Sequence, residues 1–257
     1  MIKKIAIYGK GGIGKSTTVA NLSAVWASED LNCLVIGCDP KADSTKNLVG
    51  GKFIPTVLDV MNKKGDDVTL EDIVFEGYNG VLCVEAGGPI PGVGCAGRGI
   101  IAAFEKLEEL DAFKVHNPDI VIYDVLGDVV CGGFSMPIRN GYAQDVYIVT
   151  SGEMMALYAA SNIASAVHNF DKRGYAQLAG LVLNSRNVEN EEALVRKAAE
   201  EMGEQVISII PRDGAVQQAE ALGKTVIEAL PESDMAQAYR ALADKVLEVS
   251  ERELLPA

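Results

Sequence analysis

The amino-acid sequence predicts an α/β fold in which a doubly wound, mostly parallel sheet is flanked by helices. Apolar segments rich in β-forming residues alternate along the chain with segments of helical pattern. These apolar segments are continuous, as expected of parallel strands that are covered on both faces. No internal repeat, low-complexity tract or linker divides the chain. We therefore expect residues 1–257 to form a single domain.

Each predicted element follows from this alternation. Strands are expected at residues 2–8, 33–37, 81–85, 120–123, 146–150, 181–184 and 206–210. Helices are expected at residues 15–28, 99–110, 153–170, 191–202, 216–222 and 234–251. Sheets of this kind bind ligands beyond the carboxyl ends of their strands, so the residues that follow each strand are the first candidates for a site.

Composition excludes several functional classes. The 257 residues carry 23 Lys and Arg against 36 Asp and Glu, a formal net charge of −13, which argues against nucleic acid and against an anionic membrane as partners. No apolar run approaches the roughly 20 residues of a spanning helix. The first residues lead directly into a predicted strand without a secretory signal, so we expect a cytoplasmic protein. The five cysteines are then expected to be reduced thiols or metal-cluster ligands.

A phosphate-binding loop follows the first predicted strand. The segment Gly9-Lys10-Gly11-Gly12-Ile13-Gly14-Lys15-Ser16-Thr17 fits the pattern G-x-x-x-x-G-K-S/T between a strand and a helix. Its glycines allow backbone N–H groups to surround phosphate oxygens, and the helix start adds its positive dipole end. Lys15 would reach the β- and γ-phosphates and Ser16 would bind Mg²⁺. A glycine-rich turn that binds nothing is the alternative, and this context disfavours it.

Further charged residues are placed to act on a nucleotide. Lys10 is either a solvated charge or a lysine that reaches across a dimer interface to the partner's nucleotide, as an arginine finger does in trans. Asp39 and Asp43 follow the second strand, and Asp124 follows a later one at the start of a D-x-x-G pattern, where carboxylates suit Mg²⁺ or its waters. Asp128 is a candidate to orient or deprotonate the attacking water, with an exposed turn carboxylate as the alternative.

Two later strands also end in polar side chains. Asn184-Ser185-Arg186 closes one strand and Pro211-Arg212-Asp213 closes the next. Both groups are expected at the edge of the sheet where a purine could lie, because Asn and Asp side chains can bond to base nitrogens. This pattern alone has low specificity.

The cysteines divide into two groups. Cys33, Cys38 and Cys83 lie in or at the ends of apolar strands and are expected to be buried. Cys95 and Cys131 are flanked by glycines, which permit backbone N–H groups to bond to cluster sulfur. A four-iron cluster needs four thiolates, so two copies in a C₂ dimer would be required. A zinc site, for which no short C-x₂₋₄-C pair is present, and unreactive loop cysteines are the alternatives.

One spacing links the two candidate sites. Asp124, Gly127, Asp128 and Cys131 occupy a single eight-residue stretch. A phosphate sensor and a cluster ligand would therefore share one backbone segment. Nucleotide state could then change the surroundings and the potential of the cluster directly.

Taken together, these motifs resemble the nitrogenase iron protein family over almost the whole chain. The resemblance is carried by residues 9–17, by Gly37-Cys-Asp-Pro-Lys-Ala-Asp-Ser-Thr45, and by Gly87-Gly-Pro-Ile-Pro-Gly-Val-Gly-Cys-Ala-Gly-Arg-Gly99. It continues in Tyr123-Asp-Val-Leu-Gly-Asp-Val-Val-Cys-Gly-Gly-Phe134 and Ser151-Gly-Glu-Met-Met-Ala-Leu-Tyr158. It implies a P-loop NTPase that acts as a homodimeric, ATP-dependent reductase with one 4Fe–4S cluster between its subunits.

The resemblance also implies roles for individual residues. Cys95 and Cys131 match cluster ligands, Lys10 matches the cross-dimer lysine, and Arg98 matches an arginine on the docking face that is ADP-ribosylated in some relatives. Asp128 matches the proposed base of hydrolysis. Other matches are the magnesium-shell or switch positions Asp39, Asp43 and Asp124, and the adenine and ribose positions Asn184, Pro211, Arg212, Asp213, Gln217 and Glu220. A ferredoxin or flavodoxin would reduce the cluster, and a nitrogenase-like catalytic component would receive the electron.

Two departures bear on the catalytic partner. Nitrogenase iron proteins proper have a longer C-terminal tail, and they tend to have an acidic residue at the position of Ile90. Reductases of nickel-tetrapyrrole biosynthesis and of methylthio-alkane reduction are therefore alternatives within the family. Dark-operative protochlorophyllide reductases usually have His at the position of Ala42 and match less well.

Two alternatives lie outside this function. Partitioning-type ATPases share the lysine-bearing P-loop but have no redox centre, and the acidic balance and lack of a basic amphipathic tail count against them. Iron–sulfur cluster carriers usually use C-x-x-C, which is absent from this sequence.

Overall fold

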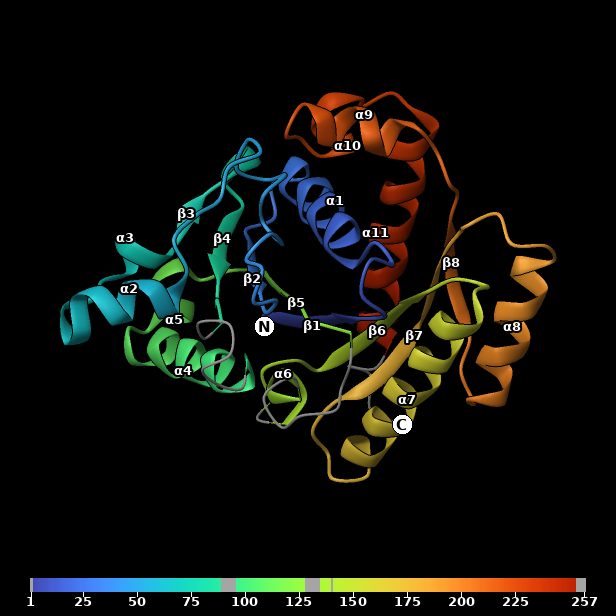
Figure 1. Ribbon diagram of the computed structural model, residues 1–257, viewed down its shortest axis with the longest axis horizontal. Coiled ribbons are helices and arrows are strands. Elements are labelled where there is room, and N and C mark those ends of the chain that lie inside the picture. The colour runs from blue at the N-terminus through green and yellow to red at the C-terminus, as the bar shows by residue number, and fades with distance from the viewer. Residues whose placement is uncertain (1, 89–95, 128–134, 140, 253–257) are drawn as a thin grey trace.

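The computed structural model, in which residues 2–88, 96–127, 135–139 and 141–252 are described, contains one eight-stranded sheet (Figure 1). Its strand order is β3-β4-β2-β5-β1-β6-β7-β8, and every neighbouring pair is parallel except β3 with β4. The strands are β1 (Lys3–Tyr8), β2 (Cys33–Gly37), β3 (Phe75–Glu76), β4 (Leu82–Glu85), β5 (Ile120–Asp124), β6 (Asp145–Thr150), β7 (Gln177–Asn184) and β8 (Val206–Ile210). The predicted mostly parallel sheet is confirmed.

The order of the strands makes the sheet doubly wound. From β1 the chain moves outward to β2 and β4, returns to β5, and then continues on the other side of β1 through β6, β7 and β8. Asp124 at the end of β5 pairs in register with Ile7 of β1 on one side and with Gly37 of β2 on the other. The segments that follow β1, β2 and β5 therefore start from the same edge of the sheet, where the predicted site residues are found.

Helices cover both faces of the sheet (Figure 1). The buried clusters place α1, α9, α10 and α11 on one face, and α2, α4 and α7 on the other. The helices are α1 (Lys15–Ser28), α2 (Val57–Lys64), α3 (Leu70–Ile73), α4 (Ala96–Glu109), α5 (Ala112–His116), α6 (Met136–Arg139), α7 (Met154–Asp171), α8 (Glu191–Glu201), α9 (Ala215–Ala221), α10 (Val226–Ala229) and α11 (Asp234–Arg252). The six predicted helices are confirmed, with shifts at some ends.

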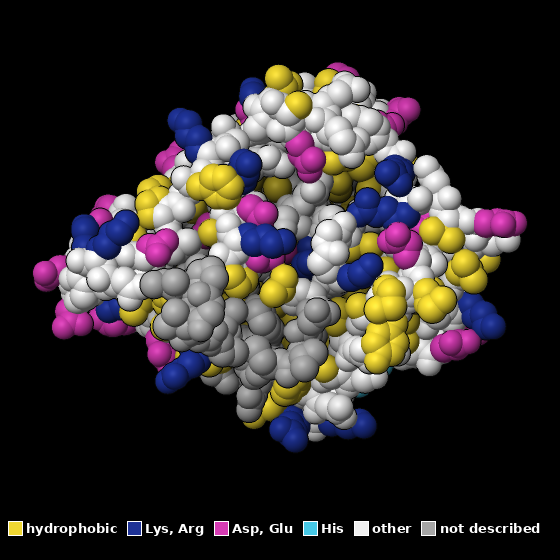
Figure 2. Space-filling view, in the orientation of Figure 1, with side chains coloured by type: hydrophobic (Ala, Val, Ile, Leu, Met, Phe, Trp, Pro, Cys, Tyr) yellow, Lys and Arg dark blue, Asp and Glu magenta, His cyan; other side chains and the backbone are white. Residues whose placement is uncertain are grey.

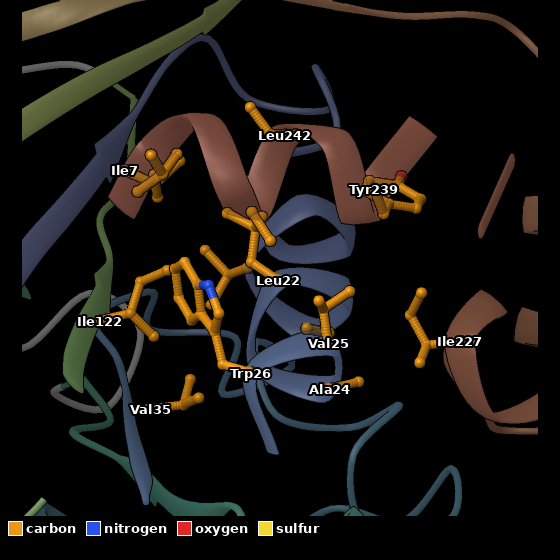
Figure 3. Packing of buried hydrophobic residues seen from close by; sticks show 14 of the residues in the cluster. Ile7, Leu22, Ala24, Val25, Trp26, Val35, Ile122, Ile227, Tyr239 and Leu242 are labelled. Carbon is orange, nitrogen blue, oxygen red and sulfur yellow. The ribbon is translucent and has the colours of Figure 1, made fainter. Parts of the chain in front are cut away.

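Strand β1 shows why these strands are apolar throughout. Ile5 and Ile7 pack into the cluster beneath α1 and α11, whereas Ala6 and Tyr8 pack into the cluster on the opposite face. Successive side chains of a strand point to opposite faces, so burial of both faces requires an unbroken apolar run. Trp26 of α1 is fully buried and lies among Leu22, Val35 and Ile122 (Figure 3).

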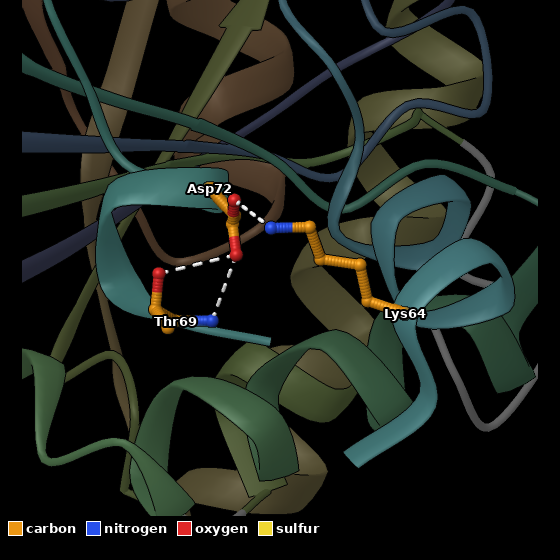
Figure 4. A network of polar contacts seen from close by, with 3 residues as sticks. All are labelled: Lys64, Thr69 and Asp72. Carbon is orange, nitrogen blue, oxygen red and sulfur yellow. Dashed lines mark hydrogen bonds and ion pairs between the residues drawn. The ribbon is translucent and has the colours of Figure 1, made fainter. Parts of the chain in front are cut away.

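The short helices between β2 and β4 were not predicted, and polar side chains define two of their starts. Thr56 accepts from the backbone N–H of Asp59 at 3.1 Å at the start of α2. At the start of α3, Asp72 accepts from the Thr69 backbone N–H at 3.0 Å, from the Thr69 hydroxyl, and from the Lys64 ammonium (Figure 4). Such caps supply the partners that first-turn N–H groups lack. Among the described residues, no helix is long and apolar enough to span a membrane.

Candidate functional site

The loop between β1 and α1 has a conformation that requires glycine. Gly9 and Gly14 have φ angles of 148° and 104°, in a region that side chains rarely adopt. There is also no room for a side chain at either position. A Cβ on Gly9 would lie 2.2 Å from the Val149 carbonyl oxygen, and one on Gly14 would lie 2.4 Å from Asn184 Nδ2. Gly14 directly precedes α1, so the loop ends at a helix N-terminus, as the sequence predicted.

Side chains donate hydrogen bonds to three carbonyl groups of this loop, two of them from outside it. Asn184 Nδ2 donates to the Ile13 carbonyl at 2.7 Å, and Arg186 Nη2 donates to the Gly12 carbonyl at 2.6 Å. Lys15 Nζ donates to the Lys10 carbonyl at 3.3 Å. In a planar trans peptide the N–H points opposite to the carbonyl, so the Gly14 N–H faces away from Asn184. The outer contacts thus set the direction of amide groups inside the loop.

A cavity of about 220 Å³ opens beside the loop, where the sequence predicted a purine site. All six adenine and ribose candidates line it, together with residues that sequence reasoning did not single out, including Met235 and Tyr239 of α11. Its lining is Gly12, Gly14, Thr17, Asn184, Ser185, Arg186, Pro211, Arg212, Asp213, Val216, Gln217, Glu220, Met235 and Tyr239. No local motif marks the α11 residues, because they reach the cavity only through packing of α11 on α1.

Two of these candidates are held by short contacts. Glu220 accepts from the Thr17 hydroxyl at 3.0 Å, which joins α9 to the first turn of α1. Asp213 accepts from the Ala215 backbone N–H at 2.6 Å and so shapes the entry into α9. Glu220 is therefore positioned by α1, and Asp213 by the start of α9.

A second cavity of about 250 Å³ lies on the phosphate side of the loop. It brings Ser16 together with Asp39 and Asp43 from the segment after β2, as predicted. Its lining is Gly11, Gly12, Gly14, Lys15, Ser16, Thr17, Asp39, Lys41, Asp43 and Leu126. Asp39 accepts from the Lys41 backbone N–H at 2.9 Å, which orders the turn that carries these carboxylates.

Asp124 lies at the inner end of this region. Its side chain is 1% exposed, and neither carboxylate oxygen has a hydrogen-bond partner among the described residues. Burial raises the pKa of this carboxyl, while the charge of the Lys15 ammonium acts in the opposite direction. A buried, unpartnered carboxylate beside a P-loop serine matches what a hydrated Mg²⁺ requires, since Mg²⁺ keeps waters that need oxygen acceptors. The residues present therefore fit MgATP.

The stretch that begins with Asp124 touches the phosphate loop directly. A Cβ on Gly127 would lie 1.9 Å from the Gly9 carbonyl oxygen and 2.9 Å from Lys10 Cα, so only glycine allows this approach. This approach of the D-x-x-G segment to the loop is thus between backbone and backbone. Asp128 and Cys131 lie outside the described residues.

Glu85 was not singled out from the sequence, because one acidic residue at a strand end carries no motif. It is fully buried at the end of β4, and its Oε1 accepts from the backbone N–H and the hydroxyl of Thr45, both at 2.7 Å. Burial raises its pKa to about 8, the Thr45 bonds oppose this, and the charges of Asp124 and Asp43 add to it. Glu85 therefore anchors the end of the segment that carries Asp39 and Asp43.

Three of the five cysteines are free, buried thiols, as predicted. Burial raises the pKa of Cys33 to about 12 and raises the pKa values of Cys38 and Cys83 as well, so all three stay protonated and are poor metal ligands. Cys95, like Cys131, lies outside the described residues. Among those described, no group of three or more His, Cys, Asp or Glu side chains could hold a metal ion.

Of two residues predicted to contact other molecules, Arg98 is exposed and Lys10 is half-buried. Arg98 is exposed in the first turn of α4. Lys10 lines a cavity of about 330 Å³ with Gly11, Gly12, Ile13, Glu153, Arg186 and Arg212. Next to Glu153, the first turns of α7 expose Met154, Met155 and Tyr158. Figure 2 shows hydrophobic side chains gathered on the α7 side of this face, close to several Lys and Arg side chains.

Comparison with known proteins decides the family. The family model described as "4Fe-4S iron sulfur cluster binding proteins, NifH/frxC family" matches residues 3–257. The chain belongs to this family. A nitrogenase iron protein from Methanospirillum hungatei JF-1 is 58% identical over 221 residues, which cover 85% of this chain and 78% of the relative. The predicted resemblance is confirmed, and the cofactors of this NifH-family chain are a 4Fe–4S cluster and MgATP.

Solved structures agree on the fold of this NifH-family chain. The cell division ATPase MinD of Pyrococcus furiosus superimposes with a TM-score of 0.74 at 20% identity, covering 97% of this chain and all of that one. The septum site-determining protein MinD of Pyrococcus horikoshii, complexed with Mg-ADP, gives 0.73 at 23% identity, covering 100% of both chains. At these identities the likeness shows the P-loop NTPase fold alone.

Proposed function

We propose that this chain is the electron-donating component of a two-component reductase. Two copies would couple hydrolysis of MgATP to the transfer of single electrons to a nitrogenase-like catalytic partner. The observation that carries this proposal is the backbone contact of Gly127 with Gly9 and Lys10, because the same stretch leads from Asp124 to Cys131. In this proposal, the short segment from Asp124 to Cys131 contacts the nucleotide site at one end and binds the cluster at the other.

The nucleotide would occupy the two cavities on either side of the phosphate loop. Lys15 and the loop amides bind the phosphates, Ser16 binds Mg²⁺, and Asp39, Asp43 and Asp124 accept hydrogen bonds from its waters. Lys10 extends to the nucleotide of the second copy. The purine and ribose lie against Asn184, Pro211, Arg212, Asp213, Gln217 and Glu220, all of which line the first cavity.

The cluster, when bound, supplies a one-electron redox centre. We assign its ligands to Cys95 and Cys131, which are the cysteines left once the three buried, protonated thiols are set aside. One chain then offers two thiolates, and a C₂ pair offers the four that a 4Fe–4S cluster needs.

Hydrolysis is coupled to the cluster through residues of this chain. Asp128 holds the attacking water, ATP and water yield ADP and phosphate, and the charge near Asp124 changes as phosphate leaves. Because Gly127 touches Gly9, a shift of the phosphate loop moves the stretch that leads to Cys131. After the cluster has given its electron to the partner, a ferredoxin or flavodoxin reduces the cluster again.

The identity of the partner is the open part of this proposal. The 58% identical relative named nitrogenase iron protein favours a nitrogenase-like acceptor that docks near Arg98. Acceptors of nickel-tetrapyrrole biosynthesis and methylthio-alkane reduction are the alternatives. Pull-down from the source cells with the nucleotide trapped as MgADP and aluminium fluoride identifies the acceptor by mass spectrometry.

The decisive experiment measures iron in anaerobically purified protein. We expect about four irons per pair of chains in the wild type. Cys95→Ser and Cys131→Ser should each lose the iron and the visible absorption, whereas Cys33→Ala should keep both. Colourless wild-type protein that resists cluster reconstitution would overturn the proposal, and nucleotide-dependent self-association without iron would favour a partitioning-type ATPase.

A further inference from the structure

Glu191, the first residue of α8, lies between the loop after β6, which borders the cavity around Lys10, and the loop after β7, which borders the purine cavity. Its side chain is 8% exposed. One carboxylate oxygen, Oε1, accepts from the backbone N–H of Gly152 at 2.9 Å and from that of Arg186 at 3.0 Å, and Oε2 accepts from the Arg186 N–H at 2.9 Å. The loop after β6 and the loop after β7 are therefore joined by a single side chain.

The protein has adapted to this side chain on the β6 side. A Cβ on Gly152 would lie 2.8 Å from Glu191 Cγ and 3.3 Å from its Cα, so only glycine leaves room for the carboxylate to cross the loop. A buried carboxylate is costly without donors, and here two backbone amides provide them. Gly152 directly precedes Glu153, which shares a cavity with Lys10.

On the β7 side the same carboxylate fixes the residue that holds the phosphate loop. Arg186 donates from Nη2 to the Gly12 carbonyl, and its own carbonyl accepts from Arg212 Nη1 at 3.5 Å. Arg186 lines both the purine cavity and the cavity around Lys10. Glu191 accepts from the Arg186 backbone N–H from outside the loop, and so fixes the backbone from which the guanidinium reaches Gly12.

We propose that Glu191 is a positioning residue for nucleotide binding, which holds Arg186 against the phosphate loop and Gly152 at the start of α7. The proposal rests on the nucleotide site assigned above. Glu191 lines neither the purine cavity nor the phosphate cavity, so it acts through Arg186 and Gly152. Without it, the buried Gly152 amide and the half-buried Arg186 amide lose their acceptor, and the Gly12 carbonyl loses a fixed donor.

The test is titration calorimetry of MgADP on the anaerobically purified full-length protein. Glu191→Ala should raise the Kd for MgADP about tenfold, since loss of a buried hydrogen-bond partner is worth roughly five- to a hundredfold in an equilibrium constant. Glu191→Gln keeps the oxygen that accepts from both amides and should stay within about threefold of the wild type. Glu191→Asp keeps the charge but is too short to reach both loops, and should behave like the Ala variant.

Glu192→Ala is the matched control. Glu192 occupies the same first turn of α8 but is exposed and pairs with Arg196 on the surface at 2.8 Å, so its loss should leave the Kd unchanged. Hydrogen exchange gives a second readout: peptides containing Gly152 and Arg186 should exchange faster in the Ala and Asp variants and at the wild-type rate in the Gln variant. If Glu191→Ala fails to fold, the comparison of Asp with Gln decides.

Two results would overturn the positioning role. One is wild-type affinity in a folded Glu191→Ala or Glu191→Asp protein. The other is equal weakening by Gln and Asp, which would show that acceptor geometry is not what matters. Wild-type protein that binds no MgADP at all would count instead against the proposed function.

Discussion

Two buried carboxylates near the phosphate loop have different surroundings. Oε1 of Glu85 has two donors from Thr45 and its Oε2 has none, whereas neither oxygen of Asp124 has a hydrogen-bond partner among the described residues. Buried polar groups are normally bonded, so an unpartnered one indicates a ligand or a function. The contrast assigns a structural role to Glu85 and leaves Asp124 for Mg²⁺ and its waters.

Glu85 makes stability depend on pH. Its pKa rises from an ordinary 4.5 to about 8, mainly through burial. The folded chain therefore keeps a proton that the unfolded chain releases above pH 4.5, and this contribution to stability is lost as the pH rises to about 8. Glu85→Gln removes the titration, so the variant should gain stability relative to the wild type across this range. Denaturant unfolding at several pH values, without Mg²⁺ or nucleotide, measures the difference; parallel curves would contradict the assignment.

Gly127 should tolerate no side chain. Gly127→Ala places a Cβ 1.9 Å from the Gly9 carbonyl oxygen, so one of the two backbone segments must move. We expect the free energy of unfolding to fall by about 1–3 kcal/mol, as for other overpacked sites, and MgADP affinity to fall with it. Gly214→Ala is the control, because Gly214 has an ordinary φ of −69° and its Cβ would meet only Gln218, at 3.9 Å. Equal stability of the two variants in urea unfolding would refute the contact.

At the scale of residues, the sequence predicted the parts of the site that follow local motifs. Residues 9–17, Asp39 and Asp43 are brought together as expected, because each follows a strand at the same edge of the sheet. Glu85, Arg186 and Glu191 acquire their roles from contacts between segments distant in sequence. No spacing along the chain records such contacts, so sequence reasoning missed the role of each.

At the scale of elements, helix α1 joins the phosphate loop to the C-terminal part of the chain. Asn21 of α1 is 2% exposed; its Oδ1 accepts from the backbone N–H groups of Val226 and Ile227 at 2.8 and 3.4 Å. These are the first residues of α10, whose N–H groups lack partners within the helix. The Asn21 side chain thus supplies the acceptor for the first N–H groups of a helix that lies far away in the sequence.

Asn21→Ala should lower the free energy of unfolding by about 1–3 kcal/mol, because the Val226 N–H is left buried without an acceptor. Ser23→Ala is a matched control on the same helix. The Ser23 hydroxyl donates only to the Val19 carbonyl within α1, so its removal should cost less than about 1 kcal/mol. Thermal unfolding of both variants measures the difference, and equal losses would show that Asn21 does not support α10.

The elements divide in the same way into predictable and unpredictable ones. Long helices such as α1, α7 and α11 and the central strands were predicted because their burial leaves a regular apolar pattern. The elements α2, α3, α5, α6, α10 and β3 were missed because they are short. Single capping side chains define the starts of α2, α3 and α10, and β3 depends on an edge contact with β4. In the sequence, such short elements are hard to distinguish from turns, because their composition resembles that of turns.

At the scale of the whole molecule, the proposed cluster would be shared between two chains. Removal of iron with a chelator should then shift the protein from a dimer towards a monomer. The reason is that the four bonds between cysteine sulfur and iron, two from each chain, link the subunits through the cluster. Analytical ultracentrifugation under anaerobic conditions measures this shift. A dimer of unchanged stability after iron loss would mean that contacts between the polypeptide chains alone maintain it.

The contact of Gly127 with Gly9 has a consequence for the diversification of such reductases. A contact made by two backbones offers no side chain whose exchange could adjust it, so in the proposed reductase it would transmit movement in the same way whatever acceptor the surface binds. The exposed side chain of Arg98 carries no such restriction. Under the proposed function, substitutions at the surface can therefore change the acceptor while the backbone contact between Gly127 and Gly9 stays the same.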